Sequence, residues 1–276
     1  MPCMPAMSLP QVSLCAIDTR SPHLALQSLQ RSMLQVAFAE VLLFCPPGFE
    51  TLQPQIRAVP IAVLRDGAEY SNFVLRELAA HIHTRHVLLT QWDGFVLDAS
   101  AWQDEFLAWD YIGAPWPDQP DERAVGNGGF SLRSRRCLVA GQDPALQPFH
   151  PEDQALCVTH RERMESVHGL RFAPRVLAQQ FAFENRSPKT PTFGFHGPYN
   201  LPRVLDEATL QSWLKALPDD FYRSRDARRL ARALLARGMA DAAVDLLSRR
   251  QAAGRQDPNT RLLATAARWL QRIKRV

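Results

Sequence analysis

The chain has 276 residues, of which 46% are hydrophobic and 22% are charged, so it is long enough and apolar enough to bury a large core. No apolar run approaches the roughly 20 residues of a membrane-spanning helix, and residues 1–10 lack the basic and apolar regions of a secretory signal. The five cysteines are scattered without zinc-binding spacing, which favours reduced thiols and a cytoplasmic location.

The formal charge of +4 is distributed unevenly along the chain. Residues 222–276 carry 14 Lys and Arg against 4 Asp and Glu, a net charge of +10, and the remainder carries −6. No RNP, helix-turn-helix or zinc-finger signature accompanies this basic tail, so nucleic acid is not the expected partner. An anionic membrane surface is the better physical candidate and admits peripheral attachment to the inner face of the cytoplasmic membrane, whereas a solvated helical face is the alternative.

From its beginning the chain alternates strands with helices. We expect strands at residues 11–17, 41–44, 61–64 and 87–90, with helices opening at residues 21–22 and spanning residues 70–83. This alternation predicts an α/β fold with a mostly parallel sheet flanked by helices. Acidic residues follow three of the strands and are expected along one edge of the sheet, namely Asp18, Asp66 and Asp93.

The fourth expected strand ends in an abrupt polar tip. Residues 87–90 form an uninterrupted run typical of strands buried on both faces. Gln91 and Asp93 follow at once, and Gly94 opens a turn. Because ligands of parallel sheets bind beyond the carboxyl ends of strands, this pair suits a site for a metal ion and a diphosphate. The alternative is that Asp93 only caps the turn.

Three later segments also carry candidate ligand-binding residues. The glycines around Asn127 (Gly126, Gly128 and Gly129) allow the backbone to approach a ligand closely, although they do not form the dinucleotide-binding G-x-G-x-x-G motif. Glu152 and Asp153 lie at an expected helix start, where capping and catalysis are equally good interpretations. His196 is followed by Gly-Pro in an aromatic and glycine-rich loop, which makes it a candidate ligand.

The basic tail has a different pattern from the body. Residues 226–247 and 259–273 have leucines at helical spacing, and Gly238 interrupts the first of these segments. They resemble tetratricopeptide helix pairs but are too few for an array. We therefore expect a catalytic domain over residues 1–205 and a helical region over residues 206–276, the latter acting as a cap or as a docking surface.

Five motifs in the body carry a family resemblance: TQWDGF, DYIGAPW, VGNGGFSLRS, PEDQ and FGFHGPYN. In this order and spacing they closely resemble a bacterial family, long described only as a domain of unknown function, within the GT-A nucleotide-diphospho-sugar glycosyltransferases. The resemblance covers residues 11–201. It implies a GT-A, Rossmann-like α/β domain that binds a nucleotide-diphosphate sugar, with UDP-sugar favoured and Mn²⁺ or Mg²⁺ as cofactor, followed here by an all-α appendage.

The resemblance also implies roles for individual residues. Gln91-Trp92-Asp93 stands where such enzymes carry Asp-x-Asp, so one metal-binding carboxylate is replaced by an amide that hard divalent ions bind less well. His196 matches the further metal ligand beside Asp93. Gly126, Asn127, Gly128 and Gly129 match the segment that contacts donor sugar and acceptor. Asp153 matches the general base of inverting members, with Glu152 as second choice.

Four further residues have two interpretations each. Arg133 either binds phosphate or lies on the protein surface at its strand end. Asp18, Arg65 and Asp66 either contact the nucleoside of the donor or cap their strand ends.

Three functions are consistent with these features. The first is a hexosyltransferase-like, inverting glycosyltransferase that moves a sugar to a glycan or lipid-linked acceptor in bacterial surface polysaccharide synthesis. The second is a sugar-nucleotide-binding relative with weak catalysis, which Gln91 allows. The third is an adaptor that acts through the basic tail.

Overall fold

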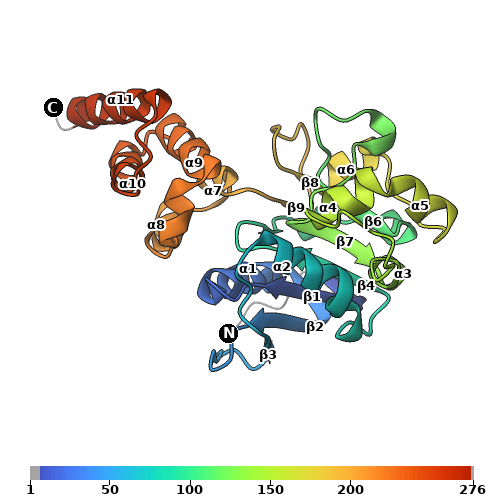
Figure 1. The fold of residues 1–276 in the computed structure, drawn as a ribbon. Coiled ribbons are helices and arrows are strands. Elements are labelled where there is room, and N and C mark those ends of the chain that lie inside the picture. The colour runs from blue at the N-terminus through green and yellow to red at the C-terminus, as the bar shows by residue number, and fades with distance from the viewer. Residues whose placement is uncertain (1–6, 275–276) are drawn as a thin grey trace. The chain divides into compact units, whose positions relative to one another are not determined.

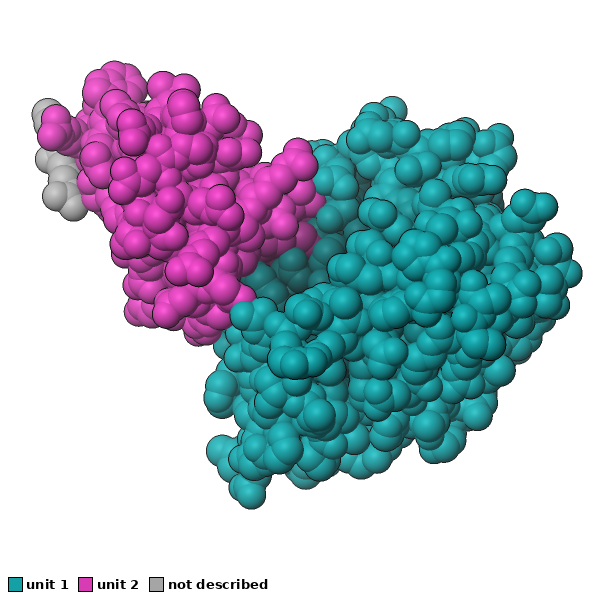
Figure 2. Space-filling view, viewed as in Figure 1, with its two compact units in different colours: residues 1–196 teal, residues 197–276 magenta. Residues whose placement is uncertain are grey.

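The computed structural model describes residues 7–274. Cys3 and most of residues 1–10, where no secretory signal is predicted, lie outside the described residues. The chain divides into two units, residues 1–196 and residues 197–276, coloured separately in Figure 2. The four cysteines in the described part are free and buried. No helix within residues 7–274 is long and apolar enough to cross a bilayer.

The first unit contains a six-stranded sheet with helices packed on it (Figure 1). Its strands and helices, in chain order, are β1 (Met7–Ile17), α1 (Pro22–Gln35), β2 (Val36–Cys45), β3 (Arg57–Pro60), α2 (Gly67–Asn72), β4 (His86–Thr90), β5 (Phe95–Val96), β6 (Tyr111–Gly113), β7 (Phe130–Ser134), α3 (Arg135–Ala140), α4 (Glu152–Gln154), α5 (Arg161–Ser166), α6 (Arg175–Phe181), β8 (Ala182–Phe183) and β9 (Gly194–Phe195).

Strand β4 lies inside this sheet, whose order is β3-β2-β1-β4-β7-β6. The pairs β1–β2, β1–β4 and β2–β3 are parallel, whereas β7 runs antiparallel to both β4 and β6. The predicted α/β class with a mostly parallel sheet flanked by helices is therefore confirmed.

Both faces of β4 are covered, as its apolar run predicts. On one face Leu88 belongs to a buried cluster with Leu29 of α1. On the other face Val87 and Leu89 cluster with Phe73, which follows α2. All five residues of the strand are buried. Since β4 has no solvent-facing side, its polar neighbours in the sequence are confined to the two strand ends.

The third strand was predicted at residues 61–64, and this is wrong. Strand β3 is Arg57–Pro60, with Arg57 opposite Leu42 and Pro60 opposite Cys45 in β2. Strand β2 ends at Cys45, and the two prolines that follow have no N–H to extend a ladder. The pairing with β2 therefore ends at Ile61, whose N–H donates to the carbonyl of Cys45. The apolar residues after Ile61 are not part of the strand.

The helix predicted over residues 70–83 starts earlier and is irregular. The Asp66 carboxylate accepts hydrogen bonds from the N–H groups of Ala68 and Glu69, and this cap starts α2 at Gly67. The regular helix ends at Asn72 and continues as a π-helical turn over Phe73–Glu77 and a 3₁₀ turn over Leu78–Ala80. The predicted apolar face is nevertheless buried against the sheet.

A second, three-stranded sheet has the order β5-β9-β8. Strand β9 pairs antiparallel with β5, which places Phe195 opposite Phe95. A Cβ atom on Gly94 would lie 2.7 Å from the carbonyl oxygen of Phe195, so only glycine allows this close approach. The pairing brings the residue after β9, His196, beside the turn that follows β4.

The second unit is entirely helical in the described chain. Its helices are α7 (Leu201–Val204), α8 (Glu207–Lys215), α9 (Arg225–Ala236), α10 (Ala240–Ala252) and α11 (Pro258–Lys274). Gly238 has a φ of 75° and separates α9 from α10, as its position predicts. Leu230, Leu234 and Leu247 are fully buried among these helices. The predicted all-α C-terminal appendage is therefore present.

Candidate functional site

The turn at residues 91–94 is held rigidly by buried hydrogen bonds. The Thr90 hydroxyl donates to the carbonyl of Gly94 at 2.7 Å, and Ser28 of α1 donates to the same oxygen. Ser28 also donates to the carbonyl of Gln91 at 3.1 Å. With its backbone fixed from two sides, the turn presents the Gln91 and Asp93 side chains in a defined direction.

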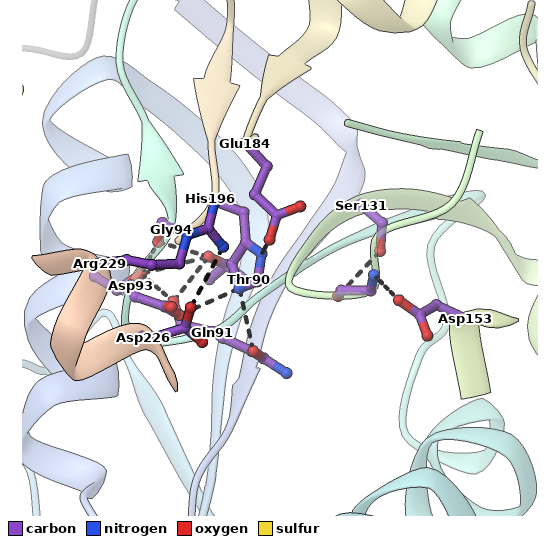
Figure 3. Close-up of polar contacts among 12 residues, drawn as sticks. Thr90, Gln91, Asp93, Gly94, Ser131, Asp153, Glu184, His196, Asp226 and Arg229 are labelled. Atoms are coloured by element: carbon purple, nitrogen blue, oxygen red, sulfur yellow. Dashed lines mark hydrogen bonds and ion pairs between the residues drawn. The ribbon is translucent and has the colours of Figure 1, made fainter. Parts of the chain in front are cut away.

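Gln91 and Asp93 both lie beside His196 (Figure 3). His196 Nε2 is 3.3 Å from Asp93 Oδ1 and 3.3 Å from Gln91 Oε1. On the other side of the ring, Nδ1 is 3.4 Å from Glu184 Oε1. Gln91, Asp93 and Glu184 thus converge on the imidazole of His196. The carboxylates of Asp93 and Glu184 flank the ring on its two nitrogen sides.

These carboxylates control the charge of His196. Burial lowers the pKa of the imidazole, but attraction to Asp93 and hydrogen bonding to Asp93 and Glu184 outweigh it and raise the pKa well above its ordinary value. The side chain is consequently an imidazolium at neutral pH. A metal ion bound at Nε2 would have to displace this proton.

The donor set nevertheless fits a divalent cation. Asp93 is buried, and its Oδ1 lies 3.3 Å from His196 Nε2, a longer contact than an ordinary hydrogen bond. Two ligands about 2.1 Å from one ion and at right angles are roughly 3 Å apart, close to the spacing around His196 Nε2. No group of three or more His, Cys, Asp or Glu forms a metal site within residues 7–274. A divalent ion between Asp93 and His196 would need a third donor of another kind, and the amide oxygen of Gln91 lies within reach.

The glycine-rich loop before β7 passes between this cluster and the acidic pair of α4. A Cβ atom on Gly129 would collide with the ring of His196, and one on Gly128 would collide with Glu152 Oε1. Asn127 adopts a left-handed φ of 62°, which brings the loop backbone into this narrow path. Both glycines are therefore required for the close approach of the loop to His196 and Glu152. The predicted approach of this loop to a ligand stays a prediction.

Arg133 and Glu152 form a buried ion pair beneath the loop. Arg133 Nη2 is 2.8 Å from Glu152 Oε1, and the two side chains are 1% and 6% exposed. The Arg133 guanidinium also lies over the ring of Tyr111 and donates to the Ser131 hydroxyl at 3.0 Å. The interpretation that Arg133 lies on the protein surface is therefore wrong, because Glu152 holds it in the interior.

Asp153 is adjacent to this pair and contacts the loop directly (Figure 3). Its Oδ2 accepts a hydrogen bond from Gly128 N at 2.9 Å. Burial and the nearby Glu152 carboxylate raise the pKa of Asp153 to about 6. The start of α4 does not hold the pKa of Asp153 down, because α4 is only one turn long and the effect of burial is larger.

A cavity of about 340 Å³ joins these groups. Its walls bring together Gln91, Glu184 and His196 on one side and Glu152 and Asp153 on the other. The complete lining is Gly67, Tyr70, Ser71, Gln91, Trp116, Asn127, Gly128, Gly129, His150, Pro151, Glu152, Asp153, Glu184 and His196. Its volume is in the range of small-molecule sites, about 300–1,000 Å³.

Other predicted site residues lie outside this lining. Asp18 accepts hydrogen bonds from the N–H groups of Arg20 and Ser21. Asp66 caps α2, and Arg65 forms an exposed ion pair with Glu69. The contacts of all three residues thus agree with the alternative interpretation, in which they cap the ends of strands or the starts of helices and do not contact the nucleoside of a donor.

Trp92 and Gly126 flank the lining rather than belong to it. Trp92 is half-buried in the turn between Gln91 and Asp93. Gly126 packs against Trp116, because a Cβ at that position would collide with the indole ring. Arg133 is not among the lining residues and forms its ion pair with Glu152, which is. Asp93 is buried behind His196.

Several lining residues were not anticipated as site residues. Glu184 follows the two-residue strand β8, which is too short to have a periodicity. Ser71 and His150 are linked by a hydrogen bond of 2.8 Å, and Ser71 also accepts from Glu152 N at 3.2 Å. His150 lies two residues before Glu152, and this proximity to an acidic pair is the only local signal for it.

Comparison with protein families gives a direct match over residues 53–196, more than half of the chain. The chain belongs to the family described as protein of unknown function DUF5672. The resemblance to a family known only as a domain of unknown function is thereby confirmed. The matched segment contains the Gln91–Asp93 turn, the glycine loop, the Glu152–Asp153 pair and His196.

Among curated proteins no sequence matches the chain. Solved structures give distant similarities to glycosyltransferases. The mannosyltransferase PcManGT from Pyrobaculum calidifontis, in complex with GDP-Man and Mn²⁺, is 13% identical over 94% of this chain and 80% of that one, with a TM-score of 0.40.

An active-site mutant of LgtC is 12% identical over 76% of this chain and 98% of its own, with a TM-score of 0.41. TarS from S. aureus, residues 1–349, is 12% identical over 94% of this chain and 91% of its own, with a TM-score of 0.37. At these identities and TM-scores no ligand or activity passes from them to this chain.

The buried ion pair generates a stability prediction. Replacing Glu152 by Gln leaves the buried Arg133 without its counter-charge, so the free energy of unfolding should fall by about 3 kcal/mol or more in urea titration. The double variant Arg133→Met/Glu152→Gln removes both charges of this pair and should lose less. Glu69→Gln, at an exposed pair, is the matched control and should be nearly neutral. Equal losses for Glu152→Gln and the double variant would contradict this account.

Proposed function

We propose that this chain is a GT-A-like, inverting glycosyltransferase. In this proposal it moves a hexose from a nucleotide-diphosphate sugar to a glycan or lipid-linked acceptor in bacterial surface polysaccharide synthesis. The observation that carries the proposal is the 340 Å³ cavity, in which the Gln91 and His196 side faces the Glu152 and Asp153 side across glycine backbone. A transfer reaction needs both a site for a leaving diphosphate and a base for the acceptor, at a short distance from each other.

Asp153 is the group best placed to accept a proton from the acceptor hydroxyl. It lines the cavity, and its Oδ2 is oriented by the N–H of Gly128. A pKa of about 6 leaves it mostly ionised at neutral pH, yet more basic than an ordinary carboxylate. Glu152 is the weaker candidate, since Arg133 holds its Oε1 in an ion pair.

The charge of the cavity supports the use of a divalent ion. Three carboxylates line it (Glu152, Asp153 and Glu184), and His196 is the cation among the lining residues of the described chain. An anionic diphosphate is not attracted to such walls unless it brings positive charge with it. Gln91, Asp93 and His196 would hold Mn²⁺ or Mg²⁺, and the ion would supply neutralisation of the charge that develops on the leaving diphosphate.

The remaining predicted contacts fit the same arrangement. Asn127, Gly128 and Gly129 line the cavity and would contact the donor sugar, with UDP-sugar as the favoured donor. Asn127 Oδ1 is buried without a hydrogen-bond partner in the described chain, which leaves an acceptor for a sugar hydroxyl.

Gln91 also supports a second candidate, a sugar-nucleotide-binding protein with weak catalysis, because an amide binds a hard cation less well than a carboxylate does. A donor-hydrolysis assay separates the two functions. The transferase should release nucleoside diphosphate from a sugar nucleotide with multiple turnovers, whereas a binding protein should bind the donor without releasing product.

The metal proposal predicts the behaviour of Asp93. Asp93→Ala removes the carboxylate donor and should abolish transfer while the chain stays folded, because Ser28 and Thr90 hold the turn backbone. Some loss of stability is expected, since one of the two carboxylates beside His196 is removed. Donor turnover with titrated Mn²⁺ is the measurement, with Asp98→Ala at an exposed turn as the matched control. Full activity of the wild-type chain in excess chelator would refute the metal site.

The base proposal predicts both a variant effect and a pH profile. Asp153→Asn keeps the shape and removes basicity, so turnover should fall about 10²-fold or more with donor affinity nearly unchanged. Because the base must be ionised, the wild-type rate should rise with pH through about 6 and then level off. Steady-state kinetics from pH 5 to 8 tests this; a product of retained anomeric configuration would exclude a base at Asp153.

The third candidate, an adaptor that acts through its tail, is supported by an exposed face of α11. Leu262, Trp269 and Ile273 are 71%, 62% and 52% exposed. They recur at spacings of seven and four residues, which places them on one side of the helix. Exposed arginines accompany them at positions 261, 268 and 272. Such a combination of apolar and basic side chains is typical of helices that lie on anionic membrane surfaces.

The tail therefore predicts salt-sensitive binding to vesicles that contain anionic lipid. Replacing Arg261, Arg268 and Arg272 by Gln should weaken this binding about 10²-fold, at about 1 kcal/mol for each charge. The matched control replaces Arg57, Arg123 and Arg186, three exposed arginines of the first unit, by Gln. Equal sedimentation with neutral and anionic vesicles would refute the electrostatic account.

A further inference from the structure

A second cavity, of about 310 Å³, lies at the opposite end of β4 from the candidate active site. It is formed where β4 begins, at His86, and where β7 ends, at Ser134. The five residues of β4 separate the two cavities by a distance on the order of 13 Å. The second cavity therefore requires its own explanation.

Four arginines line this cavity, together with a single carboxylate, that of Asp110. The lining consists of Arg85, His86, Leu107, Ala108, Trp109, Asp110, Ser134, Arg135, Arg136 and Arg171. Such a concentration of positive charge on the first unit contrasts with the net negative charge of the chain outside its basic tail.

Asp110 is engaged by the framework of the cavity. Its Oδ1 accepts a hydrogen bond from the Ser134 hydroxyl at 2.6 Å, and its Oδ2 accepts from Arg171 N at 2.9 Å. Ser134 N in turn donates to the carbonyl of Asp110 at 2.9 Å. The carboxylate thus ties together the end of β7, the start of β6 and the segment around Arg171.

The arginine side chains are oriented mainly by carbonyl groups. Arg135 donates to the carbonyls of Ala79 and Ile82, Arg136 to that of Gly169, and Arg171 to that of Ala108. A carbonyl fixes a guanidinium in place without neutralising its charge. The one ion pair among these groups in the described chain is the long contact of 3.9 Å between Arg136 and Asp110.

His86 adds an unused hydrogen-bond acceptor. It is 2% exposed, and its Nε2 lies 3.4 Å from the carbonyl of Trp109, to which only a protonated nitrogen can donate. Burial lowers the pKa of the imidazole, so the ring is neutral and Nδ1 carries a lone pair. Nδ1 is buried and has no hydrogen-bond partner in the described chain. A ligand hydroxyl would supply the missing donor.

We propose that this second cavity binds a hydroxyl-bearing anion such as a sugar phosphate, with its anionic group on the arginines and a hydroxyl on His86 Nδ1. Trp109, with Arg171 5.6 Å from its ring centre, contributes an apolar wall against which a sugar ring packs. This site is independent of the proposed transferase activity. The same chemistry occurs in a free sugar phosphate and in an acidic unit of a glycan.

Calorimetric titration of the full chain tests the proposal with glucose 1-phosphate, inorganic phosphate and glucose as probes. Glucose 1-phosphate should bind more tightly than inorganic phosphate, and glucose should not bind. Arg85→Gln, at an exposed side chain, should weaken binding of glucose 1-phosphate about tenfold or more, as expected for a charge-assisted contact. His86→Phe should remove the preference for glucose 1-phosphate over inorganic phosphate.

The matched control is Arg57→Gln, which removes the same charge from β3 at the far edge of the sheet; it should leave binding unchanged. Equal weakening by Arg85→Gln and Arg57→Gln, no binding of glucose 1-phosphate, or equal affinity for inorganic phosphate would each overturn the proposal. A short oligogalacturonide distinguishes the two sources. Tighter binding of the oligosaccharide supports an anion held in a glycan, and tighter binding of glucose 1-phosphate supports a free ligand.

Binding of the probe at the candidate active site is tested separately with the Asp153→Asn variant. Asp153→Asn alters the first cavity, where donor turnover is measured, and should leave the affinity for glucose 1-phosphate unchanged. Loss of turnover with retained binding supports a separate second site. Loss of binding in Asp153→Asn would place the probe in the first cavity and overturn the proposal, whether or not the chain proves to be a transferase.

Discussion

The burial of β4 on both faces is the constraint on which the rest of this structure depends. An apolar strand with no solvent-facing side excludes charged groups along its length, because an unpaired charge there would lose its hydration without compensation. Polar residues next to β4 in the sequence are therefore displaced to its ends. The Gln91–Asp93 turn lies at one end and Arg85 and His86 lie at the other, and each end opens into a cavity.

At the first of these ends, two glycines determine which groups can meet. Gly129 lies against His196 and Gly128 against Glu152. Only the backbone of this loop therefore separates the imidazole of His196 from the Glu152–Asp153 pair. Gly128 N also holds Asp153 at 2.9 Å. A side chain at either position would push the two walls apart. The distance between the proposed metal ligands and the proposed base thus depends on Gly128 and Gly129, which place no side chain between them.

The sequence predicts those parts of this arrangement that arise from local pattern. The apolar run of β4, the polar tip after it and the glycine loop each have a signal of their own, and each lies where it is expected. Glu184 and the pairing of Arg133 with Glu152 do not, because both depend on contacts between segments far apart in the chain. Strand β9, which positions His196, has only two residues and no periodicity to recognise. The error at β3 has a similar origin, since pairing with β2 and not hydrophobicity sets its limits.

The two ends of β4 differ in charge, and the difference follows from how each cation is held. At the first cavity Arg133 and His196 lie against Glu152, Asp93 and Glu184, so their charges are matched by carboxylates and the lining remains acidic. At the second cavity carbonyl oxygens orient the arginines and leave their charges available. The second cavity is therefore suited to an anion that binds directly, whereas the first is suited to an anion that arrives with a cation. The same strand thus separates a site that suits a metal-bound diphosphate from one that suits a free anionic group.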